Sequence, residues 1–209
     1  MKILFIGPPG SGKGTVGSLL SERLKIPIIS VGKLLRSVDP RSPYYTDIKE
    51  SMDRGDLAPN NIVGMILEKR VLEKDCLRGY ILDGWARQLS DLGYFNPGFD
   101  LVLLLKISEE VSIRRITGRR ECKTDGSIYN IYTNPPKKSG ICDLCGAPLV
   151  QRNDDKQEIV LKRLEDYKEK TLPSLEFYRK MGILTEVDGD RKPEEVFAEM
   201  VSALGIGND

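Results

Sequence analysis

The residues near the N-terminus have types and a spacing that suit phosphate binding. Residues 7–15 read Gly-Pro-Pro-Gly-Ser-Gly-Lys-Gly-Thr, between an apolar stretch at 2–6 and a segment with helical spacing of apolar residues. Backbone N–H groups of such a loop and the following helix N-terminus attract phosphate, and Lys13 adds a point charge. Gly14 follows Lys13, so the usual hydroxyl comes one residue later, at Thr15. The pattern predicts a nucleoside triphosphate site; a chance glycine-rich turn is the weaker alternative.

Arginines recur at positions that suit phosphoryl transfer. This reaction needs positioning and positive charge around the moving group, and little covalent chemistry from the protein. Considered one at a time, each arginine is best interpreted as a solvated surface charge. The ordered set is harder to explain in that way. Its members are Arg36, Arg87, Arg115, Arg119, Arg120, Arg152 and Arg163.

Three of the four cysteines lie in one segment and have the spacing of a metal site. Cys142 and Cys145 form a C-x-x-C, and Cys122 with Asp125 forms a C-x-x-D sixteen residues earlier. This matches a two-knuckle zinc pattern with one thiolate replaced by a carboxylate, which is an acceptable zinc ligand. We therefore expect a closed structural zinc site, with a disulfide or free thiols as the alternatives. Cys76 is expected to be a core residue.

Composition excludes several classes of function. The chain has 209 residues, 32 Lys+Arg and 31 Asp+Glu, so no basic field favours nucleic acid or a membrane surface. There is no histidine, which excludes acid–base catalysis by imidazole. No apolar run approaches the roughly 20 residues of a membrane span. The chain opens on an expected core strand, so we expect no signal peptide and a cytoplasmic location.

The apolar pattern alternates between strand-like and helix-like segments. Short apolar runs predict strands at 2–6, 26–29, 80–82, 101–105 and 183–187. Helical spacing predicts helices at 16–24, 34–50, 62–73, 109–117, 159–180 and 193–204, with Pro173 kinking or splitting the fifth and Asn60 or Asn61 as the N-cap of the third. This alternation predicts a parallel α/β sheet. Residues 122–155, rich in Gly, Pro, Asn and Asp, predict a small inserted lobe.

In this order the motifs resemble those of the adenylate kinases, within the nucleoside monophosphate kinase family. The resemblance covers essentially the whole length; its matching segments are 7–15, 30–36, 83–87, 118–120, 135–136, 151–155, 163–164 and 188–189. It implies a P-loop NTPase-type, five-stranded parallel sheet flanked by helices. The implied core is 1–29, 60–118 and 156–209. A helical lobe at 30–59, here called the acceptor lobe, would bind the monophosphate. An inserted β segment at 119–155, here called the lid, would carry zinc.

The resemblance also implies roles for individual residues. ATP would be held by Gly10, Ser11, Gly12, Lys13, Gly14, Thr15, Arg115, Arg119 and Asp155. The transferred phosphoryl group would meet the catalytic set of Lys13, Arg87, Arg119, Arg152 and Arg163. The monophosphate would contact Val31, Arg36, Leu57, Ala58, Gly84, Arg87 and Asp91. Asp83 would hold a water of the Mg²⁺ shell, and Asp154 with Asp155 would orient lid arginines.

These roles imply a reversible transfer from ATP to AMP that gives two ADP. The implied cofactors are Mg²⁺ with ATP and a structural Zn²⁺, and a monomer is expected because one chain carries both half-sites. Closure of the lid and the acceptor lobe would exclude water from the reacting phosphoryl group.

The chain departs from the family pattern on the acceptor side. The family's Ser-Thr-Gly-Asp is Ser-Val-Gly-Lys here, with Val31 and Lys33 as the changes, and Gly-Phe-Pro-Arg is Gly-Trp-Ala-Arg. A glutamine that reads adenine in the family is replaced by Asp91. A carboxylate only accepts hydrogen bonds, so it suits the two donors of a guanine edge better than adenine. AMP is expected first; the alternative is relaxed or shifted specificity toward GMP, CMP or UMP. Gln88 or a bridging water would preserve adenine reading.

An alternative from another class is a non-enzymatic zinc-ribbon module that binds a nucleotide, nucleic acid or protein. The balanced charge and the lack of a basic, aromatic-rich face weigh against it. It would also leave Lys13 and the arginine set unexplained.

Overall fold

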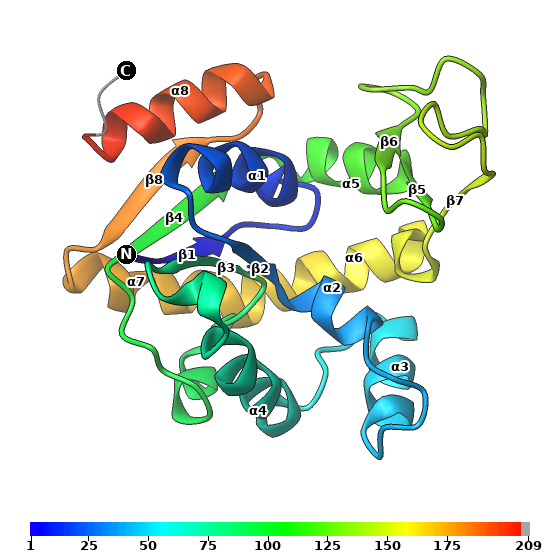
Figure 1. Ribbon diagram of the computed structural model, residues 1–209. Coiled ribbons are helices and arrows are strands. Elements are labelled where there is room, and N and C mark those ends of the chain that lie inside the picture. The colour runs from blue at the N-terminus through cyan, green and yellow to red at the C-terminus, as the bar shows by residue number, and fades with distance from the viewer. Residues whose placement is uncertain (206–209) are drawn as a thin grey trace.

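Five parallel strands form the centre of the protein, as the computed structural model in Figure 1 shows. The structure describes residues 1–205, so the last four residues of the expected core lie outside the described residues. The strands are β1 (Lys2–Ile6), β2 (Ile28–Ser30), β3 (Tyr80–Asp83), β4 (Leu101–Lys106) and β8 (Leu184–Asp188), in the order β2-β3-β1-β4-β8. All five predicted strands and the parallel sheet are confirmed. Because β1 is central, the loop that follows it opens at the middle of the carboxyl edge.

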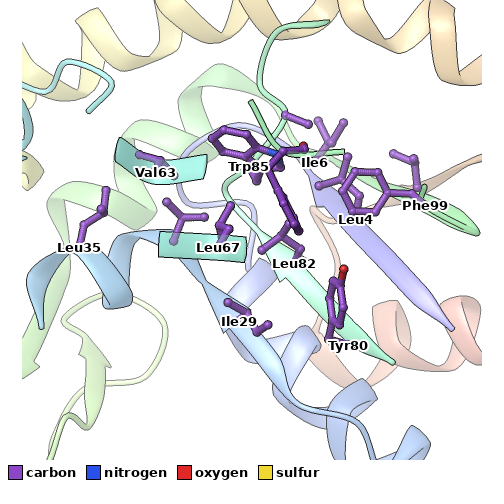
Figure 2. Close-up of a cluster of buried hydrophobic side chains, with 14 of the residues drawn as sticks. Leu4, Ile6, Ile29, Leu35, Val63, Leu67, Tyr80, Leu82, Trp85 and Phe99 are labelled. Atoms are coloured by element: carbon purple, nitrogen blue, oxygen red, sulfur yellow. The ribbon is translucent and has the colours of Figure 1, made fainter. Parts of the chain in front are cut away.

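Helices cover both faces of this sheet. α1 (Lys13–Leu24) and α8 (Pro193–Ala203) lie on one face, and α4 (Asn60–Val71) and α7 (Leu172–Lys180) lie on the other. Alternate residues of β1 point to the two faces of the sheet. Ile3 and Phe5 pack against α1 and α8, whereas Leu4 packs in a second core cluster, on the face covered by α4 and α7. Figure 2 shows that second cluster, which gathers the side chains of Leu4, Ile6, Ile29, Leu35, Val63, Leu67, Tyr80, Leu82, Trp85 and Phe99.

The acceptor lobe contains two short helices. α2 (Val31–Arg36) starts directly after β2, and α3 (Tyr45–Asp53) follows a loop at 37–44. The predicted single helix over 34–50 is therefore wrong. Pro40 and Pro43 lie in the loop, and each removes a backbone donor and disfavours helix in the residue before it. The predicted Asn N-cap of α4 is also displaced, because Pro59 occupies that position.

The lid is a three-stranded antiparallel sheet that follows α5 (Glu109–Thr117). Its strands are β5 (Arg119–Cys122), β6 (Ile128–Asn130) and β7 (Leu149–Val150), in the order β6-β5-β7. Its apolar cluster is small and is centred on Cys122, Tyr129 and Cys142. A lobe with so little buried apolar surface gains most from a metal staple.

A long helical segment returns the chain from the lid to the sheet. It consists of α6 (Gln157–Asp166), a π-helical turn (Tyr167–Thr171) and α7. The predicted helix over 159–180 is interrupted at this turn, and Pro173 lies in the first turn of α7, where its missing N–H is not needed. Three 3₁₀ turns complete the elements: Lys74–Cys76, Leu89–Gly93 and Asn153–Asp155. Within residues 1–205, no helix has the length and apolar character needed to cross a bilayer.

Candidate functional site

The loop between β1 and α1 has the backbone shape of an anion cradle. Gly10 and Gly12 have φ values of 76° and 92°, a region that L side chains rarely adopt. A Cβ at Gly10 would lie 3.0 Å from the carbonyl oxygen of Ser112, so α5 also restricts this position to glycine. α1 has no side-chain N-cap, and its first N–H groups therefore remain available to a ligand.

The Lys13 ammonium folds back over the loop. Its Nζ donates to the carbonyl oxygens of Gly7 and Pro8 at 2.8 and 3.0 Å and to Ser11 Oγ at 3.0 Å. Burial lowers the pKa of Lys13 to about 8, and nearby cations add to this effect while the Asp83 carboxylate opposes it. Lys13 is thus held beside the loop with its charge poorly compensated.

Cations from three separate segments lie around Lys13. Arg87 follows β3, Arg119 begins β5 and Arg163 lies on α6, and the charges of all three act to lower the pKa of Lys13. Burial lowers the pKa of Arg163 to about 10, and Arg119 and Arg87 contribute to that decrease. The structure therefore brings Lys13, Arg87, Arg119 and Arg163 together. Because these cations repel one another, the region attracts a polyanion.

Two aspartates on one 3₁₀ turn hold the arginines that surround this region. Asp155 is fully buried and accepts from Arg119 Nε at 2.9 Å, with a second bond from the same guanidinium to its other oxygen. Asp154 Oδ2 accepts from Arg163 at 3.1 Å and from Arg36 of the acceptor lobe at 2.9 Å. The turn at Asn153–Asp155 thus links the acceptor lobe, the lid and α6.

Arg152 has a different partner. Its NH2 group donates to Glu121 Oε1 on β5 at 2.7 Å, and its Nε is buried without a hydrogen-bond partner among the described residues. Glu121 also accepts from Lys123 at 2.6 Å. These bonds from Arg152 and Lys123 lower the pKa of Glu121 to about 2, against the effect of its partial burial. Glu121 was not among the residues selected from the sequence.

The Asp83 carboxylate lies at the carboxyl end of β3, beside the loop. Its Oδ1 is buried and has no hydrogen-bond partner in the described part of the chain. An unpaired carboxylate oxygen beside the loop is chemically suited to a Mg²⁺-bound water. The residue therefore fits the cation that accompanies ATP.

Two of the residues predicted to bind the monophosphate, Val31 and Gly84, lie beside Arg87. A Cβ at Gly84 would lie 3.4 Å from the Arg87 guanidinium and 3.6 Å from Val31 Cβ, so these three residues are neighbours. Arg36 lies at the end of α2. Ala58 is buried in the core cluster, and Leu57, just before it in the chain, is only half-buried.

The Asp91 carboxylate forms a local cap. Its Oδ2 accepts from the Gln88 N–H at 3.2 Å in a capping box at the turn Leu89–Gly93, and only 2% of the residue is exposed. Oδ1 is buried without a partner among residues 1–205. Burial raises the pKa of Asp91, and the Gln88 hydrogen bonds and the Arg87 charge oppose this effect. Glu or Asp three residues after a polar side chain is the sequence signal of this cap.

Arg115, predicted to lie against the ATP base, bridges α5 and the segment after β8. Its NH1 donates to the carbonyl oxygen of Gly189 at 2.8 Å, and its own carbonyl accepts from Asn130 of the lid at 2.7 Å. It therefore lies at the junction of the core and the lid.

The four predicted zinc ligands lie together. One ligand atom from each of Cys122, Asp125, Cys142 and Cys145 falls within 4.8 Å of the others, and Cys122 Sγ lies 3.4 Å from Cys145 Sγ. Four thiolate or carboxylate ligands about 2.0–2.3 Å from a zinc ion are separated by about 3–4 Å, and the observed cluster is compatible with that spacing. The four cysteines form no disulfide in this structure.

Comparisons with known proteins agree with this geometry. The family model described as "Adenylate kinase" matches residues 5–183. The chain is 41% identical to the adenylate kinase of Thermodesulfovibrio yellowstonii, over 98% of this chain and 99% of that protein. It is 40% identical to the adenylate kinase of Clostridium tetani over the full length of both chains. The identity with the adenylate kinase of Thermoanaerobacter pseudethanolicus is 41%, over 98% of each chain. The chain therefore belongs to the adenylate kinase family and is a phosphotransferase.

Proposed function

We propose that the chain transfers the γ-phosphoryl group of Mg–ATP to the phosphate of AMP and forms two ADP. The bond from the γ-phosphorus to the β–γ bridging oxygen breaks, and a bond to an AMP phosphate oxygen forms. The gathering of Lys13, Arg87, Arg119 and Arg163 carries this proposal. Four cations from separate segments repel one another in the free protein, and the phosphates of the two bound nucleotides would relieve this repulsion.

Within this proposal the residues divide between donor and acceptor. The loop at 7–15, Lys13 and Arg119 hold the ATP phosphates, and Arg115 lies against the base. Arg36, Arg87 and the neighbouring Val31 and Gly84 hold the monophosphate. Arg152 and Arg163 meet the transferred group as the lid closes. A bound Mg²⁺ would supply charge neutralisation to the ATP phosphates, and Asp83 would hold one of its waters.

The buried cap at Asp91 supports AMP as the acceptor. If Asp91 read a guanine edge, its carboxylate would have to leave the Gln88 N–H and face the monophosphate pocket. With Asp91 committed to the turn, the acceptor base is read by other groups. The Gln88 side-chain oxygen is part of the same cap, which leaves its NH2 group to donate to the base. The protein then has no carboxylate that disfavours adenine N1.

We further propose the division into a core (1–29, 60–118 and 156–209), an acceptor lobe (30–59) and a lid (119–155). Zinc is the metal that best fits the lid cysteines and Asp125. Thiolate ligands of this kind persist in the reducing cytoplasm, which we propose as the location. A monomer suffices because every proposed contact comes from one chain.

The deciding experiment compares AMP, GMP, CMP and UMP as acceptors with Mg–ATP as the donor. We expect turnover with AMP to exceed the others by at least tenfold. Lys13→Ala and Arg87→Ala are expected to lower kcat by about a thousandfold, in the range found for charges that stabilise phosphoryl transfer. Arg179→Ala is the matched control, because this exposed arginine pairs with Glu176 and Glu186 away from the loop. Full activity in Lys13→Ala would contradict the proposed function.

A further inference from the structure

Strand β5 directs two charged residues to the side of the clustered arginines. Successive side chains of a strand point to opposite faces, so Arg119 and Glu121 share one face while Arg120 and Cys122 share the other. Cys122 belongs to the four-residue metal cluster. Arg119 meets the buried Asp155. One face of this short strand therefore carries a member of the candidate metal cluster, and the other faces the clustered arginines.

Glu121 contacts Arg152 in a nearly enclosed position. The two side chains are 13% and 11% exposed, and the contact from Arg152 NH2 to Glu121 Oε1 is 2.7 Å. The second oxygen, Oε2, accepts from Lys123, whose side chain is 62% exposed. β7 pairs Val150 with Glu121, and this register places Arg152, two residues further along the chain, beside the carboxylate.

The carboxylate counteracts repulsion among cations. Burial lowers the pKa of Arg36, and the charges of Arg152 and Arg119 lower it further, whereas those of Asp154 and Glu121 raise it. Three guanidinium groups thus lie close enough to disfavour one another. Asp154 and Asp155 hold Arg36 and Arg119, and Glu121 is the carboxylate that holds Arg152.

The contact leaves most of the Arg152 guanidinium unused. Arginine has five N–H donors, and one NH2 proton goes to Glu121. Nε is buried without a partner in the described residues, which is costly unless a ligand supplies an acceptor. A phosphoryl oxygen is such an acceptor. Glu121 can therefore keep its bond while the other donors bind the transferring group.

We propose that Glu121 is a positioning residue that holds Arg152 in the orientation in which it meets the transferred phosphoryl group. The inference rests on the role given to Arg152 under the proposed function. Glu121 touches no substrate in this scheme; it acts by removing rotamer freedom from Arg152 and by offsetting the charge of neighbouring arginines.

The test is a double-mutant cycle with steady-state kinetics. Glu121→Gln, which keeps the shape but removes the charge, is expected to lower kcat about fivefold to tenfold, with KM for ATP and AMP changed less than twofold. Glu121→Asp keeps the charge but withdraws it by one methylene, so its kcat is expected to lie between those of the wild type and Glu121→Gln. Lys123→Met is the matched control: it removes the exposed partner of the same carboxylate, and its kcat is expected to equal that of the wild type.

Arg152→Ala completes the cycle. In that background Glu121→Gln is expected to have no further effect on kcat, because nothing remains to be positioned. Zinc content and the thermal midpoint of each variant verify that the lid is intact. An equal fall of kcat in both backgrounds, or an unchanged or raised kcat in Glu121→Gln, would overturn the inference. A wild-type kcat in Arg152→Ala, with Lys13→Ala inactive, would instead remove Arg152 alone from the proposed function.

Discussion

The partly buried Lys13 is expected to make nucleotide affinity depend on pH above about 8. In the free protein the pKa of Lys13 is about 8, because the ammonium has lost water and faces Arg87, Arg119 and Arg163. Bound phosphates add negative charge and raise that pKa again. ATP therefore binds the ammonium form, and above pH 8 binding must be accompanied by uptake of one proton.

The magnitude follows from the titration. Near pH 9 about nine-tenths of Lys13 is neutral in the free protein, so the apparent Kd for ATP is expected to rise about tenfold per pH unit above 8. The rise ends where the pKa of the complex is reached. Below pH 8 the affinity is expected to be level, apart from ionisation of the terminal phosphate, which is complete by about pH 7.5.

Isothermal titration calorimetry from pH 7.5 to 9.5, in two buffers of different ionisation enthalpy, measures both the affinity and the proton uptake. We expect close to one proton per ATP at pH 9. Lys13→Arg is the control, because its guanidinium remains charged throughout and its affinity is expected to stay level. A wild-type affinity that is level to pH 9.5, with no proton uptake, would refute the argument from burial and repulsion.

Three further results are expected. Asp155→Asn leaves a buried guanidinium uncompensated and is expected to lower the free energy of unfolding by about 2 kcal/mol or more in urea denaturation, whereas Asp39→Asn, an exposed ion pair, leaves the midpoint unchanged. Tyr178→Phe removes a buried hydroxyl without a partner in the described chain and is expected to stabilise by about 0.5–1 kcal/mol; a loss instead would indicate an ordered water there. Purified protein is expected to contain one zinc per chain by mass spectrometry. Asp125→Ala is expected to lower the zinc content and the thermal midpoint. Asp143→Ala is the control and is expected to change neither, because the Asp143 carboxylate accepts from a backbone N–H. A wild-type protein purified without zinc would exclude the site.

The sheet was predictable because its signals are local. A continuous apolar run such as 101–105 has few alternatives to a strand covered on both faces, and the glycine loop requires a strand before it and a helix after it. The helix predicted over 34–50 failed because apolar spacing continued across Pro40 and Pro43, and helix breakers should have outweighed periodicity.

The electrostatic partners in the site could not be predicted in this way. Arg36 and Asp154 are 118 residues apart, and nothing in their local sequence indicates that they meet. The capping box at Asp91 does have a local signal, Gln88 three residues before it. Asp91 also stands four residues after Arg87, where the family has its base-reading glutamine, and this second pattern predicted base recognition instead. Glu121 was missed for the opposite reason: a single acid in a strand of four residues carries no pattern.

The π-helical turn at Tyr167–Thr171 has a geometric consequence for the whole molecule. An α-helix advances about 100° per residue, and a π-turn contains one residue more, so the apolar stripe beyond it is rotated by about a quarter turn. Before the turn, Val160 and Leu164 face Ile116 on α5; beyond it, Leu175 enters the core beside the sheet. One continuous helical segment thus packs against two differently oriented apolar clusters. This rotation lets the helical segment that begins after the turn at Asn153–Asp155 pack its far end into the core cluster beside the sheet.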